Sequence, residues 1–407
     1  MRVLHTSDWH LGSKLFNHDR QPDIRERLRE IAAHLKEQQV DVMVVAGDLF
    51  HKKHHRTEEL QQAVNDLRES FKPFLLQGGT IVAISGNHDN EALLDLLHMA
   101  QDLAAPVDTR ASGPRPSGRL YLGTRPGVLR LVGRDGQPVQ FVLLPYPTPE
   151  RYLRGEETAY ESREAKNASL QRGLIRHLEA LRQQADPSLP SVLVAHAHVR
   201  GSQLHNLYEI ELKDDVVFDP GHLPGNYAYT AYGHIHKAQE IAGSERIRYS
   251  GSIERMNKDE REDQKSVVLL DVSAGAQARP TLLPLNATPI LCETITRPDA
   301  DLQRLAALPG RERAILYYTL AVPAEANKAE IVHALERLFP RTVRETPPEV
   351  APGERGGPAR GQAALTSRLA DVSGTVTDYL AEKLREHPRR DEAIGLVRRL
   401  LAMEGRS

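Results

Sequence analysis

An aspartate and a histidine, Asp8 and His10, stand two positions apart just after a short apolar run near the start of the chain. In extended backbone, residues two positions apart point to the same side, so both side chains can reach one point. A carboxylate oxygen beside an imidazole nitrogen is a ligand pair suited to Mn²⁺, Fe²⁺ or Zn²⁺. The same pair is also compatible with a capping aspartate next to a surface histidine. The rest of the sequence favours the metal-site interpretation, because the pattern recurs.

Four more groups of ligand-type residues each follow an apolar run that is typical of a buried strand. These groups are Gly47-Asp48, Gly86-Asn87-His88-Asp89, His196 with His198, and Gly233-His234-Ile235-His236. In α/β sheets, ligands gather outside the carboxyl ends of the strands, so the five groups are predicted to converge. Carboxylates, an amide oxygen and imidazoles suffice for two ions that share one carboxylate, an arrangement that suits in-line phosphoryl displacement.

Each group also has a simpler structural interpretation. Gly47-Asp48 is compatible with a turn at a strand end, and Asn87 with the N-cap of the next helix. His234 and His236 are compatible with surface positions. Five such groups in succession, each at a strand end, favour one shared site over five coincidences.

The elements that position these residues alternate along the chain, which predicts an α/β fold. Strands are expected over 40–46, 80–85 and 191–195. Helical spacing of apolar residues predicts helices over 18–36, 57–71, 91–103 and 159–184. Asp135-Gly136 between two apolar runs predicts a β-hairpin. After residue 285 the pattern restarts and predicts a small α+β unit.

Length and composition bound the class of protein. With 407 residues the chain exceeds the size at which a single core stops growing, so two or three domains are expected. A net charge of −2 neither requires nor excludes nucleic acid, because binding depends on local basic surface. The single cysteine, Cys292, excludes an intrachain disulfide and a cysteine-based zinc site. We see no signal-peptide pattern and no membrane-spanning apolar run, and we expect a cytoplasmic protein without a membrane partner.

The motifs resemble those of the calcineurin-like metallophosphoesterases, and among them the nucleases of DNA break repair. Three stretches carry the resemblance: Thr6-Ser7-Asp8-Trp9-His10-Leu11-Gly12, Gly47-Asp48-Leu49-Phe50-His51, and Gly251-Ser252-Ile253-Glu254-Arg255 followed by Lys265. It covers residues 1 to about 272 by motif and the remainder only in architecture. It implies a layered β-sandwich flanked by helices, with a small α+β capping domain and a C-terminal helix-loop-helix.

The resemblance also implies roles for single residues. One ion would be held by Asp8, His10, Asp48 and His236, and the second by Asp48, Asn87, His196 and His234. His88 would contact the scissile phosphate as a proton donor or charge stabiliser, unless it is a ligand or a packing residue. From its position in the sequence, and not from the resemblance, Asp89 is expected either to orient His88 or to cap the helix that begins at Glu91. His196 is preferred to His198 because it directly follows the apolar run.

DNA contacts are expected from His51, Lys52 and Lys53, since phosphate contacts dominate nucleic-acid affinity. A solvated loop is the alternative. Lys258 and Ser266 depart from the family pattern, as does the segment 208–212, which leaves substrate contacts less certain than metal binding.

We expect four segments: a nuclease core (1–280), a DNA-binding capping domain (281–345), a flexible linker rich in Pro and Gly (346–363) and a helix-loop-helix (364–407). One apolar stripe of the last segment contains Leu365, Leu369, Val372, Val376 and Leu380. Such helices dock either on this chain or on a partner, and the linker favours a partner. The resemblance implies an ABC-type ATPase with long coiled coils, and a homodimer formed through 57–71 and 91–103. The chain lacks a phosphate-binding loop of its own and is expected to bind no nucleotide.

The expected function is a Mn²⁺-dependent two-metal DNA phosphodiester hydrolase, with Fe²⁺ or Mg²⁺ as alternative ions. It would be an exonuclease on double-stranded DNA and an endonuclease on single-stranded and hairpin DNA, acting at the nucleoid in repair, recombination and replication. A phosphatase or cyclic-nucleotide phosphodiesterase is the alternative, although it needs only the compact core. A non-catalytic scaffold is a further alternative, which the intact ligand set disfavours.

Overall fold

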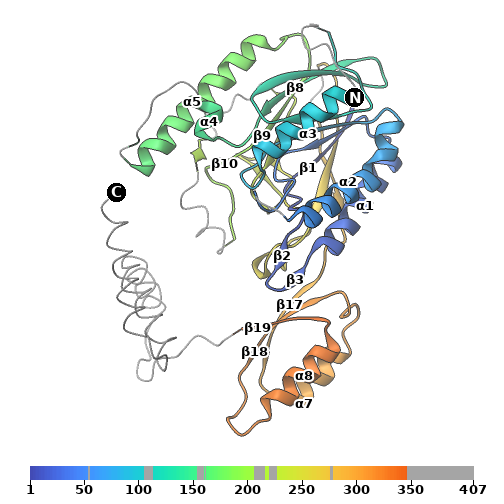
Figure 1. Cartoon of the computed structure of the whole chain (residues 1–407), viewed down its shortest axis with the longest axis vertical. Helices are drawn as coiled ribbons and strands as arrows, with labels where there is room; N and C mark the ends of the chain where they lie inside the picture. Colours follow the sequence, from blue (N-terminus) through green and yellow to red (C-terminus); the bar gives the residue numbers. More distant parts are fainter. Residues whose placement is uncertain are drawn as a thin grey trace. The chain divides into compact units, whose positions relative to one another are not determined.

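The computed structural model describes residues 1–53, 56–104, 113–153, 160, 162–205, 216–219, 227–275 and 278–345. All of them belong to the first of two compact units, Met1–Pro347 (Figure 1). The predicted linker (346–363) and helix-loop-helix (364–407) lie outside the described residues.

The first six-stranded sheet carries the N-terminal motifs. Its strands, in spatial order, are β16 (Thr281–Pro284), β15 (Ser266–Asp271), β1 (Arg2–Thr6), β4 (Val42–Val45), β5 (Thr80–Ile84) and β6 (Leu120–Gly123). The strands β1, β4, β5 and β6 are parallel, whereas β15 and β16 are antiparallel additions at one edge. The sheet therefore continues past residue 280, where we placed the end of the core, to Pro284.

Three helices cover one face of this sheet because their apolar stripes bury against it. They are α1 (Gln21–Glu37), α2 (Thr57–Leu76) and α3 (Glu91–Ala104). The predicted helix over 18–36 begins late, since His18 and Asp19 form β3 (His18–Asp19) and pair with β2 (Lys14–Leu15).

The second six-stranded sheet carries the C-terminal motifs. Its order is β13 (Gln239–Ile241), β14 (Ser244–Tyr249), β12 (Tyr229–Gly233), β9 (Ser191–His196), β8 (Pro138–Leu144) and β7 (Gly127–Val132). The predicted hairpin at Asp135-Gly136 joins β7 to β8. Helix α5 (Arg163–Gln184) covers the outer face, after the short α4 (Pro149–Tyr152), and β10 (His198–Val199) pairs with β11 (Val217–Phe218).

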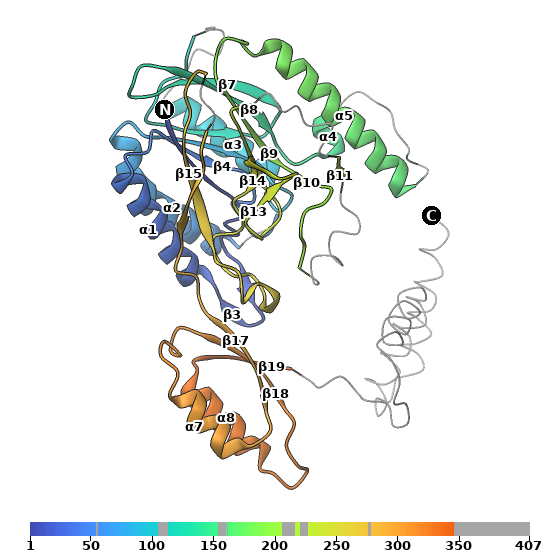
Figure 2. The same cartoon turned by 180° about the vertical axis from the view of Figure 1, so that it is seen from behind.

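The two sheets pack face to face and share one core (Figure 2). Val44 and Val82 of the first sheet lie in the same buried cluster as Phe141 and Val194 of the second. The result is an α/β fold of helices, sheet, sheet and helix, in which both large sheets are mixed. The alternating pattern of elements predicted the α/β class. Within the described ranges, no helix has the length and apolar character needed to cross a membrane.

A smaller three-stranded parallel sheet follows. It consists of β17 (Ile290–Ile295), β18 (Ile315–Leu320) and β19 (Arg341–Arg344), with α7 (Pro298–Ala306) and α8 (Lys328–Leu338) against its core. Strand β19 was not predicted. Leu15 of the β2–β3 hairpin packs with Ile315 and Tyr317 of this sheet, and so joins the small unit to the loop after β1.

Candidate metal centre

The five predicted groups of ligand-type residues meet where the carboxyl ends of strands from both sheets converge. The first sheet contributes the segments after β1, β4 and β5, and the second contributes the end of β9 and the segment after β12. The seven predicted ligands are brought together there: Asp8, His10, Asp48, Asn87, His196, His234 and His236. All are buried except Asn87, which is half-buried.

The ligand atoms fall into two compact groups, within each of which they lie within 4.8 Å of one another. One group contains Asp8, His10 and His236, and the other contains Asp48, His196 and His234. The Asp48 carboxylate lies between them, because its Oδ2 is 3.4 Å from His196 Nε2 and 3.8 Å from His10 Nε2. Asn87 Oδ1 lies 3.0 Å from ring nitrogens of both His196 and His234.

The backbone that presents these side chains is not extended, which corrects our argument from strand geometry. Asp8, His10 and Asp48 have φ values of 52°, 48° and 54°, and His234 has a φ of 104°. The loops after β1 and β4 hold each other in this conformation, since the Asp8 amide donates to Gly47 O at 3.0 Å. Such conformations cost about 1–3 kcal/mol per residue and concentrate at functional sites.

Two glycines allow the segments that carry the candidate ligands to lie close together, Gly86 within the first sheet and Gly233 between the two sheets. A Cβ on Gly86 would lie 2.0 Å from Asp48 Oδ1, and a Cβ on Gly233 would lie 1.9 Å from Ala46 O. Any larger residue would displace the segments that carry the candidate ligands.

Hydrogen bonds on the far side of two imidazoles set their tautomers. His196 Nδ1 donates to Ala46 O at 2.7 Å, which leaves Nε2 as the ring atom that faces Asn87 and Asp48. His236 Nδ1 lies 3.1 Å from Glu260 Oε1, and its Nε2 lies 2.9 Å from His10 Nε2. Imidazole nitrogens that face one another beside carboxylates, with the opposite nitrogens already bonded, form a donor set that fits divalent metal ions.

The electrostatics favour an anionic Asp48. Burial raises its pKa, but the imidazoles of His196, His10 and His88 outweigh burial and hold the pKa well below its usual value. For His196, burial lowers the pKa, and the Asp48 charge outweighs it and raises the pKa to about 9. Burial and the neighbouring His236 hold the pKa of His10 well below its usual value.

His88 and His51 lie together at the edge of these groups. The His88 amide donates to Asp48 Oδ1 at 2.9 Å, and His88 Nδ1 donates to His51 O at 2.9 Å. Their rings stack at 5.8 Å, and His51 Nδ1 lies 3.4 Å from His10 Nδ1. Lys52 and Lys53 are exposed on the same loop.

Asp89 does neither of the things we expected of it. Its carboxylate accepts the amides of Gly86 at 2.8 Å, Phe50 at 2.9 Å and Leu49 at 3.3 Å, and so ties the β4 and β5 loops together. The cap of α3 comes from Asn90, whose Oδ1 accepts the Leu93 amide at 3.1 Å.

Some residues near the groups were not predicted, and one predicted alternative, His198, belongs to neither group of described residues although its ring centroid lies 6.3 Å from that of His234. Tyr146 has its ring centroid 5.7 Å from that of His234, and no signal in the sequence marks it. Glu260 contacts His236 but stands in an ordinary charged run. His198 is buried, yet it belongs to neither group among the described residues. The stripe residues Leu365, Leu369, Val372, Val376 and Leu380 lie outside the described residues.

Residues 1–238 match the family model of the calcineurin-like phosphoesterases. The chain belongs to this family. Its relatives include the SbcD component of the SbcCD nuclease from Rhodobacter capsulatus, which is 32% identical over 361 residues, 83% of this chain and 84% of that one. The SbcD component from Escherichia coli K12 is 29% identical over 286 residues, 68% of this chain and 66% of that one. The chain is thus a homologue of SbcD over most of its length.

Among solved structures, a dimetal phosphatase from Danio rerio aligns with a TM-score of 0.41 at 11% identity, over 70% of this chain and 99% of that one. That likeness is too distant to bear on this site. Membership of a phosphoesterase family and the two buried His/Asp groups together describe a centre suited to a pair of metal ions.

Proposed function

We propose that this chain is a Mn²⁺-dependent, two-metal DNA phosphodiester hydrolase that works with an SbcC-type ATPase in DNA repair and recombination. It would act as an exonuclease on double-stranded DNA and as an endonuclease on single-stranded and hairpin DNA. The observation that carries the proposal is the pair of buried ligand groups flanking Asp48, in a homologue of proteins named as components of a nuclease.

The proposed ligands of the first ion are Asp8, His10, Asp48 and His236, and those of the second are Asp48, Asn87, His196 and His234. Bound divalent ions supply Lewis-acid stabilisation of phosphoryl oxygens and activate the attacking water. The chain itself would position the donor atoms. Asp48 would provide a shared anion, and the hydrogen bond to Ala46 O would fix the orientation of the His196 ring.

His88 is proposed to act on the phosphate rather than on a metal ion. Its Nδ1–H is committed to His51 O, so Nε2 is the atom that can carry a proton to the leaving oxygen or bond to the phosphate. The exposed Lys52 and Lys53 on the adjoining loop would contact the DNA backbone, with His51 nearer the site. Residues 281–345 would act as the capping, DNA-binding domain.

Dimerisation through α2 and α3 is part of the proposal. Leu96, Met99 and Leu103 of α3 are large apolar side chains that are 59–84% exposed. Between the two helices lies a cavity of about 360 Å³ lined by Leu67, Phe71 and other apolar residues. A second copy of this chain would cover this surface, and the helix-loop-helix (364–407) would bind the ATPase.

The test is a cleavage assay of the full chain on linear and hairpin DNA and on a small phosphate ester. Each substrate is tested with and without Mn²⁺ and the ATPase partner. We expect DNA cleavage that requires Mn²⁺. Hydrolysis of the small ester without any DNA cleavage would favour the phosphatase or cyclic-nucleotide phosphodiesterase instead.

His196→Ala and His198→Ala form a matched pair for the ligand assignment, because both histidines are buried and lie two positions apart. His196→Ala is expected to abolish Mn²⁺-dependent cleavage, since its Nε2 faces Asp48 and Asn87. His198→Ala is expected to keep it. The opposite result would move the ligand to His198.

A further inference from the structure

Glu260 is a fully buried carboxylate in contact with a proposed metal ligand. It is 0% exposed, and its Oε1 lies 3.1 Å from His236 Nδ1. Its other oxygen accepts from Lys265 Nζ at 2.6 Å and from the Met256 amide at 3.2 Å.

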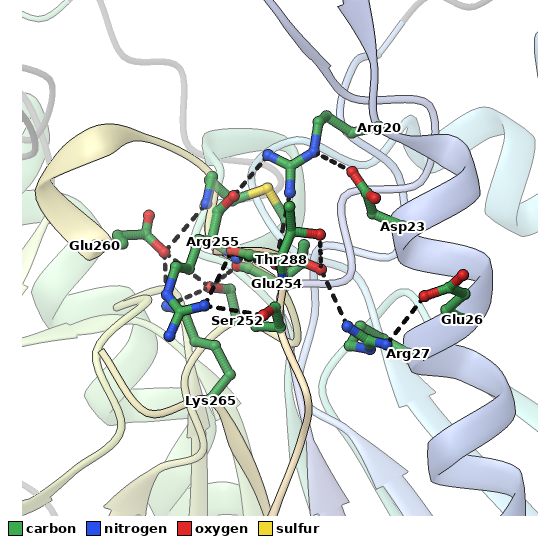
Figure 3. A network of polar contacts seen from close by, with 12 residues as sticks. Arg20, Asp23, Glu26, Arg27, Ser252, Glu254, Arg255, Glu260, Lys265 and Thr288 are labelled. Atoms are coloured by element: carbon green, nitrogen blue, oxygen red, sulfur yellow. Dashed lines mark hydrogen bonds and ion pairs between the residues drawn. The ribbon is translucent and has the colours of Figure 1, made fainter. Parts of the chain in front are cut away.

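Lys265 connects this carboxylate to the backbone of the same histidine. Its buried Nζ donates to Glu260 Oε2 and also to His236 O at 3.0 Å. Ser252 Oγ accepts from it at 2.9 Å (Figure 3). Asp263 Oδ2 also accepts from it, at 3.2 Å. His236 is therefore held from two directions, at its ring by Glu260 and at its carbonyl by Lys265.

A buried ion pair is weak evidence of a contribution to stability, because apolar side chains of similar volume often serve as well. The position of this pair suggests another role. A carboxylate at Nδ1 keeps the proton on that atom and turns the Nε2 lone pair toward His10 and Asp8. Metal-binding histidines commonly donate their second ring N–H to such an acceptor.

A second buried glutamate nearby, Glu254, contacts none of the proposed ligands through its carboxylate in the hydrogen bonds and ion pairs of the described residues. Glu254 is also 0% exposed, but it accepts the Thr288 amide at 2.8 Å and the Thr288 hydroxyl at 3.0 Å. Its carboxylate also lies 3.5 Å from Arg20 and from Arg27 (Figure 3). These contacts join the core to the start of the small sheet rather than to a candidate ligand.

We propose that Glu260 is a positioning residue for His236, fixing the tautomer and orientation of that ring for metal binding, with Lys265 as its counterion. This rests on the proposed function only for the identity of the group that His236 holds.

The test uses the full chain, stripped of metal, and Mn²⁺ alone as the probe. In Glu260→Gln the single amide oxygen would bond to Lys265, which has only donors, and the NH₂ group would face His236 Nδ1. In that arrangement His236 Nδ1 would have to accept a hydrogen bond, so the ring proton would move to Nε2, the atom that is proposed to bind the metal ion. We expect calorimetric titration to show one of the two Mn²⁺ sites weakened about 10–100-fold. Glu254→Gln is the matched control, expected to lower the melting temperature without changing either Mn²⁺ affinity.

If Glu260→Gln does not fold, Glu260→Leu with Lys265→Met replaces the ion pair by apolar side chains, and we expect the same weakening. Unchanged Mn²⁺ affinity in either variant would overturn the inference, and so would an equal loss in Glu254→Gln. A wild-type chain that takes up no Mn²⁺ would overturn the proposed function, and this inference with it.

Discussion

At the scale of single residues, His88 is held by hydrogen bonds at both its backbone amide and its ring. Its amide bonds to Asp48 and its ring to the His51 carbonyl, so Nε2 is directed away from the backbone that carries it. It nevertheless lies close enough to His10 and His51 to form a third set of possible ligands. A substitution can separate the two roles, because a ligand retains metal and a proton donor does not.

His88→Leu is expected to keep two Mn²⁺ ions and near-normal DNA affinity while cleaving ~10²–10⁴-fold more slowly. Metal analysis of the purified variant, gel-shift titration and single-turnover cleavage measure the three quantities. Loss of an ion together with activity would make His88 a ligand.

The residues around the site were predictable to different degrees. Ligand types at strand ends sufficed to predict that Asp8, Asp48 and His196 would converge. Glu260 was not predictable, since nothing distinguishes it from its charged neighbours until the fold buries it beside His236. The true partners of Asp89 are backbone amides, which no side-chain pattern reveals.

At the scale of elements, the alternation of strands and helices was predictable because each buries an apolar face with its own period. The left-handed turns after β1 and β4 were not, since two loops distant in sequence impose them on each other. Strand β19 and the β2–β3 hairpin were also missed, because they are short and polar.

The last residue of β12, Gly233, offers a test of the contact between the sheets. Gly233→Ala places a Cβ 1.9 Å from the Ala46 carbonyl and must shift the segment that carries His234 and His236. We expect loss of Mn²⁺ binding, measured by calorimetry. Gly243→Ala is the control, since its φ is +67° but no atom lies within 4 Å of the added Cβ. Gly243→Ala should lower the free energy of unfolding but should still bind both Mn²⁺ ions.

His5 links the two sheets and makes their packing sensitive to acid. Its ring bonds to Tyr229 Oη at 3.0 Å and to Tyr232 O at 3.2 Å. Burial lowers its pKa to about 3. Between pH 6.5 and pH 3, His5 therefore binds a proton in the unfolded chain but not in the folded chain. The stability that neutral His5 contributes is complete above the ordinary pKa of 6.5 and is lost as the pH falls toward 3.

Between pH 7 and pH 5, the free energy of unfolding of the metal-free wild type should therefore fall by ~2 kcal/mol more than that of His5→Gln. Urea unfolding at both pH values measures this difference. His333→Gln, at an exposed position on α8, should retain the wild-type pH dependence. Equal slopes for wild type and His5→Gln would show that His5 does not cause the acid sensitivity.

At the scale of the whole molecule, all residues of the proposed metal centre belong to one of the two units of the chain. Every proposed ligand, both large sheets and the small sheet belong to Met1–Pro347, the first of the two units into which the chain divides. The last described strand, β19, ends at Arg344, and the Glu345 amide still bonds to Tyr318 O at 2.8 Å. The proposed ligands run from Asp8 to His236, and none of them comes from residues 348–407.

A chain that ends at residue 364 is therefore expected to fold, to dimerise and to bind two Mn²⁺ ions, yet no longer to co-purify with the ATPase. In the full chain, Leu369→Asp should weaken the complex, because Leu369 belongs to the apolar stripe that is proposed to bind the partner. Ser367→Asp adds the same charge on the opposite side of the predicted helix, about 160° away at 100° per residue, and should leave the complex intact. Sedimentation of each variant with and without the ATPase measures assembly, and metal analysis confirms the centre. A truncated chain that binds the ATPase as tightly as the full chain would place the docking surface within residues 1–364.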